Sequence, residues 1–475
     1  MKIHASARLL TSRRAVAAAT LCLSAAAVGG CSKQDVASRS VGFEPNYVYS
    51  RVIQTREEIE LKDDDFIRDV NRFTEQWFGT PDEPRIPPLL QEDEDLAELI
   101  NLENLKMASG PAPADTTTPG HRGLYQQLCV SCHGETGQGR GVVAASQNPY
   151  PRDFRKGLFK YKFTARNSKP TREDLRHTLR NGLPGSQMPK FDHLSDQQIE
   201  ALIDYVIYLS LRGEFERQLI GELMYDYEPG MRVLVEPPKP DTGAASGTAD
   251  ATAAADAAAT EAEEEPEPSE AQELYEEQLE IAADELEDIA MSWLDAEDEV
   301  IEPEEPENTV VAGRGDEPVD ETELAASVER GRKLFVNAVA ACSKCHGESA
   351  KGDGPQLPDY DDWTKEWTQQ IYINPADRGE TLPFLVDGAL PPQPIRPRNL
   401  VEGLFRGGSH PDEIYHRIVE GIAGTPMPAA ARSSGEGSVG LTEDDIWDLV
   451  NYVLSLKSDE PAAGPTQEQT ASAGL

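Results

Sequence analysis

Two short runs in the sequence combine residues that could attach a cofactor: CVSCHG at 129–134 and CSKCHG at 342–347. In each, two cysteines are separated by two residues and followed directly by histidine. This spacing is typical of c-type haem attachment, because the thiols form thioethers with the vinyl groups and the adjacent imidazole can bind iron. A redox C-x-x-C pair and half of a zinc site are the alternatives, but a zinc site built from both cysteine pairs would not explain either histidine. We therefore expect two covalently bound haem c groups, held by Cys129, Cys132, His133, Cys342, Cys345 and His346.

The two motifs lie within repeated blocks of sequence. PRDFRKGLFK at 151–160 corresponds to PRNLVEGLFR at 397–406, and LSDQQIEALIDYVIYLS corresponds to LTEDDIWDLVNYVLSLK. Together with the motif blocks and the GSQMP and GTPMP elements, these matches follow one order in both halves and indicate a duplicated domain. Each closing block begins with a helix cap, Ser195 or Thr442, followed by apolar residues at helical spacing. The predicted fold class is all-α, with two small domains packed around haem.

This order of parts resembles the class I c-type cytochromes over roughly residues 118–215 and 324–458. That family has an N-terminal helix, C-x-x-C-H, a Gly-rich loop, a Pro-bearing loop, a Met loop and a C-terminal helix. The resemblance implies that Met188 in GSQMPKF and Met427 in GTPMPAA supply the second axial ligand to each iron. Core filling is the alternative role for a methionine.

The resemblance also suggests residues around each haem. Pro151 and Pro397 would accept or position the hydrogen bond that orients each histidine, and Arg152 and Arg398 would approach the haem propionates. A turn residue and a surface charge are the alternative roles. Other histidines could compete for iron, and we expect all of them to lie at the surface: His177, His193, His410 and His416.

The N-terminal 30 residues have the pattern of an export signal, with early basic residues and the apolar run AVAAATLCLSAAAV. Their ending, VGGC, resembles the lipobox of bacterial lipoproteins, which implies lipidation of Cys31. The alternative is a soluble secreted protein cleaved near Gly30, with Cys31 as a free thiol. We expect an exported protein on the periplasmic side, anchored to a bacterial membrane by lipid.

Composition divides the rest of the chain. After an N-terminal region at 31–117 we expect a first cytochrome domain at 118–235, an acidic linker at 236–323, a second domain at 324–458 and a disordered tail at 459–475. From Pro240 to Gly313 the linker has 25 Asp and Glu and no Lys or Arg, against a net charge of -41 for the chain. Its ELYEEQLEIAADELEDIAMSWL run has the spacing of an amphipathic helix. We expect this run to be a loosely helical, mostly solvated spacer rather than a docked helix.

Two further segments carry large aromatic residues. In the region 32–117, Phe66, Val70, Phe73 and Trp77 form a helix stripe that we expect to dock on the first domain rather than in a membrane complex. The second domain contains an insertion at 356–395, relative to the first. Its aromatic residues predict packing over the domain or against a partner: Trp363, Trp367 and Tyr372.

Two His/Met haems would leave no open iron position, so we expect single-electron transfer and no enzymatic activity. The expected function is that of a membrane-anchored dihaem cytochrome in a respiratory chain, either free or as a subunit of a quinol-oxidising or terminal oxidase complex. Its partners would be redox proteins that donate and accept electrons, with no small-molecule substrate and no nucleic acid. The linker would let one domain reach away from the membrane. The alternative is a dihaem cytochrome c peroxidase, in which one iron opens for peroxide.

Overall fold

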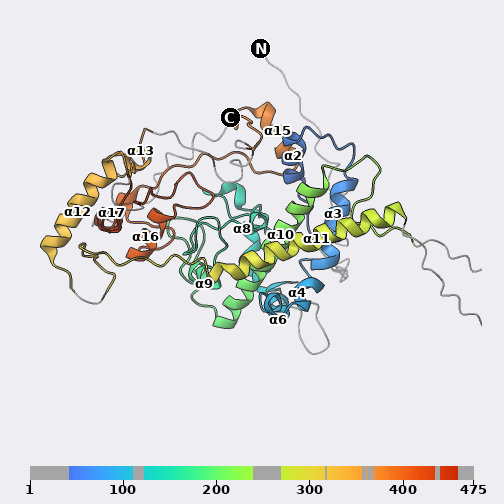
Figure 1. Cartoon of the computed structure of the whole chain (residues 1–475), viewed down its shortest axis with the longest axis horizontal. Coiled ribbons are helices and arrows are strands. Elements are labelled where there is room, and N and C mark those ends of the chain that lie inside the picture. The colour runs from blue at the N-terminus through green and yellow to red at the C-terminus, as the bar shows by residue number, and fades with distance from the viewer. Residues whose placement is uncertain are drawn as a thin grey trace, which may run out of the picture. The chain divides into compact units, whose positions relative to one another are not determined.

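The computed structural model describes residues 42–110, 122–238, 269–315, 318–355, 360, 367, 370–433 and 439–457. The predicted signal segment, Cys31, Trp363 and the tail at 459–475 lie outside these residues. In the described part of the chain the regular structure is helical, with isolated β-bridges only (Figure 1). The predicted all-α class is confirmed. None of the described helices combines the length and apolar character needed to cross a bilayer.

The first domain is organised around α10 (Asp196–Leu223), which continues well beyond the predicted apolar run. Its N-cap is the predicted Ser195, in a capping box with Gln198. Because α10 carries apolar residues on all sides, it is buried along most of its length. The other helices of this domain are short: α7 (Leu124–Leu128), α8 (Val130–His133), η1 (Ala144–Ser146), η2 (Phe154–Lys156) and α9 (Arg172–Asn181).

The N-terminal region packs on α10, as predicted. Phe66, Val70 and Phe73 are each at most 2% exposed and belong to the same core as α10. Trp77 stacks on Phe215 of α10, with the ring centroids 5.4 Å apart. The helices of this region are α2 (Tyr47–Arg56), α3 (Asp65–Phe78), α4 (Pro88–Glu92), α5 (Glu94–Ala97) and α6 (Leu102–Ala108).

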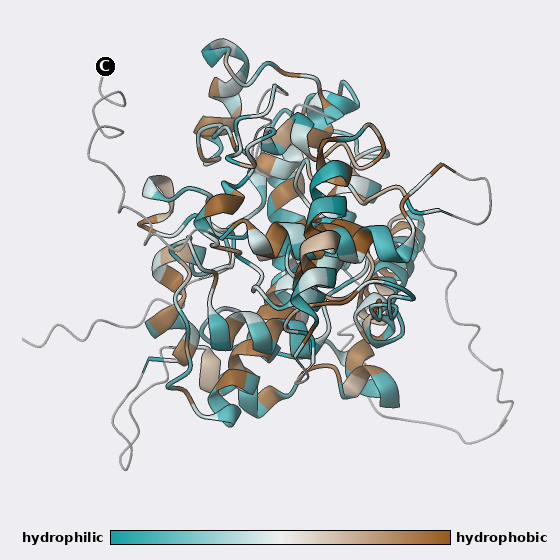
Figure 2. Cartoon of the chain, turned by 90° about the vertical axis from the view of Figure 1, so that its left-hand side faces the viewer, coloured by the Kyte–Doolittle hydropathy of each residue, from teal (hydrophilic) through white to brown (hydrophobic). Residues whose placement is uncertain are grey.

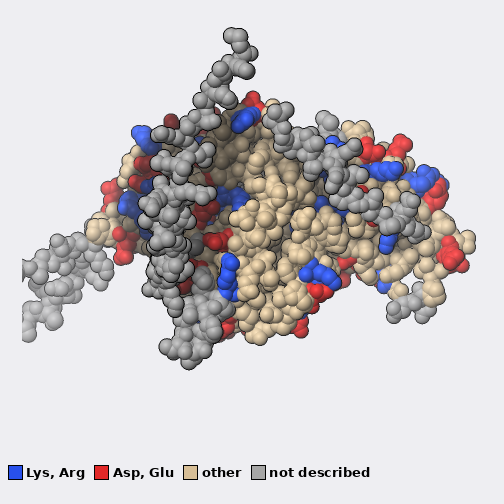
Figure 3. All heavy atoms as spheres, turned by 180° about the vertical axis from the view of Figure 1, so that it is seen from behind, with Lys and Arg blue, Asp and Glu red and all other residues tan. Residues whose placement is uncertain are grey.

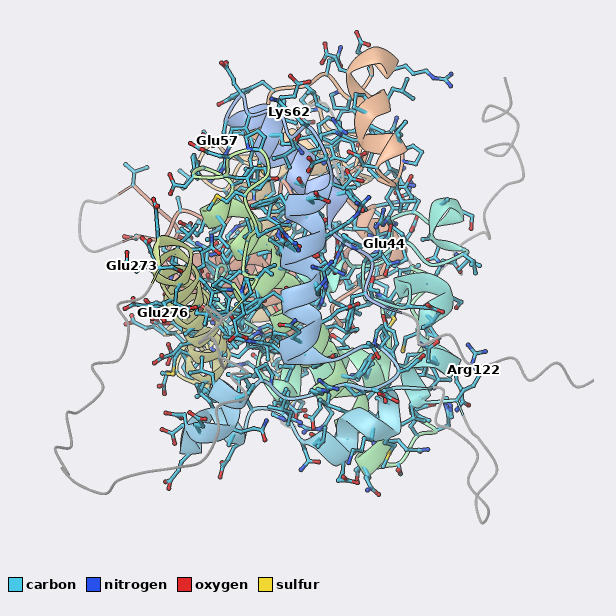
Figure 4. All side chains as sticks on the ribbon, turned by 90° about the vertical axis from the view of Figure 1, so that its right-hand side faces the viewer. Glu44, Glu57, Lys62, Arg122, Glu273 and Glu276 are labelled. Atoms are coloured by element: carbon cyan, nitrogen blue, oxygen red, sulfur yellow. The ribbon has the colours of Figure 1, made fainter. Side chains whose placement is uncertain are left out.

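The linker contains a docked helix, so the prediction of a mostly solvated spacer is wrong for this part. Helix α11 (Glu270–Leu294), followed by η3 (Asp295–Glu297), packs along α10 and buries Leu286, Ile289 and Trp293 in the core of the first domain. Its acidic residues lie on the opposite face, where Figure 4 shows Glu273 and Glu276 pointing outward. The apolar stripe of α11 therefore covers a face of α10 that would otherwise meet water.

The second domain has its own core. Helix α12 (Glu321–Val336) packs on α17 (Glu443–Ser455), and α16 (Pro411–Val419) packs on the other side of α17 (Figure 1). The predicted cap Thr442 forms a capping box with Asp445. Short helices α13 (Ser343–His346) and η4 (Leu400–Glu402) complete the domain. Its helices alternate brown apolar and teal polar residues along the ribbon (Figure 2), and apolar residues of α12, α16 and α17 form the core.

The segment after η3 joins the two domains. Ala165 N–H donates to the Glu299 carbonyl at 2.9 Å, and Ile301 N–H donates to the Phe163 carbonyl at 2.8 Å. A few residues later, Trp447 Nε1–H of α17 donates to the Glu304 carbonyl at 2.8 Å. This part of the linker is thus bound to both domains. The expectation that the linker lets one domain reach away is wrong for residues 299–304.

The insertion of the second domain packs within its own chain, against the N-terminal region. Trp367 is 1% exposed, stacks on Phe384 of α15 (Arg378–Val386) at 4.6 Å and shares a small core with Val48 and Val52 of α2. Tyr372, by contrast, is 84% exposed. Contacts with the first domain continue along the insertion, where the Tyr150 hydroxyl donates to the Pro391 carbonyl at 3.0 Å.

The docking of α11 predicts the effect of removing its last large anchor. Trp293→Ala should lower the free energy of unfolding by about 3 kcal/mol, because it removes a buried indole that packs edge-on against Phe159. Chemical denaturation followed by circular dichroism measures this. Glu276→Ala, on the exposed face of the same helix, is the control and should change the value by less than about 0.5 kcal/mol. Equal, small effects of both variants would contradict the docking.

Candidate haem sites

The first motif places its histidine at the end of a short helix. Helix α8 ends at His133, and Gly134 follows with φ +77°. His133 Nδ1 lies 3.0 Å from the Arg152 carbonyl oxygen, and the imidazole stacks on Phe154 at 4.6 Å. Burial lowers the pKa of His133 to about 4, so the ring is neutral and Nδ1–H donates to the carbonyl. Nε2 then keeps the lone pair that a metal ligand needs.

The second motif repeats this arrangement. His346 ends α13, and its Nδ1 lies 3.2 Å from the Arg398 carbonyl oxygen. Burial again lowers the pKa of the imidazole. The loop that follows each motif also closes in the same way, since Gly139 N–H donates to the His133 carbonyl and Gly352 N–H to the His346 carbonyl, both at 2.8 Å. The duplication found in the sequence therefore extends to individual hydrogen bonds.

The acceptors of the histidine hydrogen bonds differ from the predicted residues. We expected Pro151 and Pro397 to accept or position this bond, but the carbonyl that accepts it belongs to the next residue in both domains. The Pro397 carbonyl instead lies against Gly352, where a Cβ would meet it at 2.3 Å. Gly352 also has φ +75°. Both the positive φ and the lack of space for a Cβ therefore require glycine at this position. The proline's fixed φ thus helps to set the turn that aims the following carbonyl.

The cysteines lie beside their histidines, half-buried at the edge of each core. Burial raises the pKa of Cys129 to about 12 and that of Cys342 to about 11. The thiols of Cys129 and Cys342 are therefore protonated. Among the described residues, no group of three or more His, Cys, Asp or Glu side chains is placed to bind a metal ion.

The two methionine loops have the same internal structure. The Met188 N–H donates to Ser186 Oγ at 3.1 Å, and the Met427 N–H donates to Thr425 Oγ1 at 3.2 Å. Each methionine carbonyl accepts a backbone bond at 3.1 Å, from Leu183 or Ile422. Both methionine side chains are half-buried, and Met188 packs on the core that Cys129 also contacts. The pairing of each methionine with an iron stays a prediction.

Two arginines of the second domain fit a bound dicarboxylate. Arg398 Nε and Arg406 Nε are buried and have no hydrogen-bond partner in the protein. Burial and then the nearby charge of Arg406 lower the pKa of Arg398, as expected for two guanidinium groups that share one site. Haem carries two propionate carboxylates that would satisfy such donors. The residues present therefore fit haem, which Cys342, Cys345 and His346 would hold and whose propionates the two arginines would meet.

Arg406 was missed in the sequence, although a signal was present. The repeated block places Lys160 and Arg406 at equivalent positions, so a cation occurs there in both domains. A basic residue at the end of an otherwise apolar GLF segment could therefore have predicted a side chain that binds a carboxylate.

The other histidines differ from the prediction that all lie at the surface. His193 is exposed and His410 caps α16, but His177 is half-buried and its Nε2 lies 2.9 Å from Glu413. His416 is 4% exposed, with the Phe163 ring edge-on to it at 4.6 Å. The prediction is wrong for His416, because α16 faces residues of the first domain rather than water.

Comparison with known proteins identifies both domains. Residues 118–206 match the family described as cytochrome c oxidase, cbb3-type, subunit III, and residues 328–400 match the family described as cytochrome c. The chain is therefore an all-α protein with two cytochrome c domains, which implies covalently bound haem c. Among solved structures, it is similar to a chain of the Kuenenia stuttgartiensis reducing HAO-like protein complex, with 23% identity, a TM-score of 0.39 and coverage of 70% of this chain and 94% of that one. No match to a curated protein was found.

The two attachment motifs predict the haem content. The wild-type protein should carry two haems that survive denaturation, and a Cys342→Ser, Cys345→Ser variant should carry one, because its second domain cannot form thioethers. Mass spectrometry and the pyridine haemochrome absorbance per chain measure both values. A Cys129→Ser, Cys132→Ser variant is the matched control and should also retain one. Two covalent haems in either variant would contradict the assignment.

His416 predicts a pH dependence of stability. Burial lowers its pKa to about 4, below its ordinary value of 6.5. The unfolded chain therefore takes up a proton first as the pH falls, so stability contributed by neutral His416 is present above pH 6.5 and is lost between pH 6.5 and 4. His416→Phe has no group to titrate at this position. Its unfolding free energy should therefore fall between pH 7 and 5 by about 2 kcal/mol less than that of the wild type.

Chemical denaturation at the two pH values measures the effect. The control is His193→Gln, at an exposed position, which should keep the wild-type pH dependence. An unchanged pH dependence in His416→Phe would show that His416 is not held neutral by burial.

Proposed function

We propose that the protein is a membrane-anchored dihaem c-type cytochrome that carries single electrons in a respiratory chain, free or as a subunit of a quinol-oxidising or terminal oxidase complex. Bound haem would supply the one-electron chemistry. The chain's own residues would bind and orient it through His133, His346, Met188 and Met427. With both axial positions filled, neither iron would offer a site for a substrate.

The observation that carries this proposal is the contact of each methionine loop with the other domain. Arg166 of the first domain donates to the Met427 carbonyl at 2.8 Å. In the other direction, Arg398 of the second domain lies beside Gly185 in the Met188 loop, with Nη2 2.7 Å from where a Cβ would stand. Electron transfer between haems slows steeply with distance. Because each methionine loop contacts the other domain, the arrangement favours a relay between the haems.

The proposed setting follows from the sequence. The pattern of residues 1–30 and Cys31 supports export and a lipid anchor on the periplasmic side of a bacterial membrane. The match of the first domain to a family named for an oxidase subunit supports a place in a respiratory complex.

Redox proteins would be the partners, as electron donor and acceptor. On the face shown in Figure 3, uncharged residues cover the centre, and charged side chains gather toward the edges. An uncharged centre with a charged rim suits docking of another protein. The first domain is basic, with 15 Lys and Arg against 10 Asp and Glu from Gly120 to Arg217, which would favour an acidic partner.

A dihaem peroxidase is the alternative function, and it requires one iron to open. The same internal bonding in both methionine loops favours two closed sites. The two functions make opposite predictions for ligand binding to the reduced protein, which allows a direct test.

Carbon monoxide distinguishes them. The visible spectrum of the reduced, haem-loaded wild type should not change with carbon monoxide, because both irons are closed. Met188→Ala and Met427→Ala should each show a shift of one haem's worth of absorbance, since each opens one axial position. A shift of one haem in the wild type would instead support the peroxidase-type function.

A further inference from the structure

Contacts between the two domains converge on the loop that carries Met427. Arg166 extends from the first domain, between η2 and α9, to residues 420–427 of the second domain. Its Nη1 donates to the carbonyl oxygens of Glu420 at 3.2 Å and Met427 at 2.8 Å, and its Nη2 donates to that of Thr425 at 3.2 Å. Its backbone N–H donates to Glu420 Oε2 at 2.9 Å. One residue of the first domain thus binds both ends of this loop.

The chemistry of the contact requires a guanidinium group. Three carbonyl oxygens from different parts of the loop point to one planar fork, and only arginine offers several fixed donors in one plane. Gly421 makes room for it, because a Cβ there would lie 2.4 Å from Arg166 Nη1. Lysine has a single charged nitrogen on a flexible stem and could not match the three carbonyls at once.

The contact reinforces a bond that shapes the loop. The Met427 carbonyl accepts from Ile422 N–H at 3.1 Å as well as from Arg166. The Thr425 hydroxyl both donates to the Ile422 carbonyl at 2.8 Å and accepts from Met427 N–H at 3.2 Å. Arg166 therefore acts on the backbone that fixes the position of the Met427 side chain, and does so from outside the domain.

We propose that Arg166 is a positioning residue that holds the Met427 loop closed, so that docking of the first domain strengthens methionine ligation in the second. The inference rests on the proposed function, in which Met427 is the axial ligand opposite His346. Without the guanidinium group, the loop keeps its internal bonds but loses its attachment to the first domain. An external ligand then competes more easily with the methionine sulfur.

Imidazole binding to the oxidised, haem-loaded full chain tests this proposal, because imidazole can replace methionine at ferric iron. Arg166→Ala should bind imidazole about tenfold more tightly at one haem and as the wild type does at the other, reflecting the loss of charge-assisted hydrogen bonds. Arg166→Lys should fall between Arg166→Ala and the wild type. Arg68→Ala removes the same charge from an exposed position on α3 and should match the wild type at both haems.

The absorption band of the iron–methionine bond, in the red region of the oxidised spectrum, provides a second measurement. This band should persist in Arg166→Ala without imidazole. The haem whose band disappears in Met427→Ala should be the one at which Arg166→Ala changes the imidazole affinity. Wild-type imidazole affinity in Arg166→Ala, or equal tightening at both haems, would overturn the positioning role while leaving the ligation intact. Retention of both bands in Met427→Ala would instead contradict the ligation, and with it the proposed function.

Discussion

The hydrogen bond from each motif histidine to a loop carbonyl constrains much of the rest of the structure. The partners are 19 residues apart in the first domain and 52 in the second, a difference of 33 residues. Since both bonds have nearly the same length, the additional residues must leave the domain and return without moving the carbonyl. The insertion therefore cannot lie within the haem domain. The insertion packs outside the domain, where Trp367 contacts apolar residues of α2.

The two domains are joined by several contacts of different kinds. Backbone bonds link residues 163–165 to 299–301, the insertion packs on α2, and Arg166 binds the Met427 loop. Charge supports the arrangement, because the strongly acidic linker contributes α11 to a basic first domain. Apolar burial nevertheless determines where α11 lies, since its acidic residues face outward and its apolar stripe faces α10.

The sequence predicted what depends on short spacings. The haem motifs, the caps Ser195 and Thr442 and the N-terminal aromatic stripe all follow from neighbouring residues on one helix or loop. The docking of α11 was predicted wrongly, because its apolar stripe suits a docked helix and a marginal solvated one equally. His177 and His416 occupy equivalent positions in the repeat, yet one pairs with Glu413 and the other is buried neutral. Their environments differ because of the contact between the domains, which cannot be predicted from the periodicity of the sequence.

The docked linker changes how two haems in one chain would work together. If the linker were a free tether, the frequency of contact between the domains would depend on their effective concentration, and chance encounters would set the rate of electron transfer between the haems. Here residues 299–304 bind both domains, and Arg166 joins the first domain to the Met427 loop of the second. Under the proposed function, transfer between the haems would then depend on a fixed geometry rather than on diffusion. Only electron transfer with the donor and acceptor proteins would require an encounter. Surface charge would therefore affect the rates of those two steps, and packing between the domains would affect transfer between the haems.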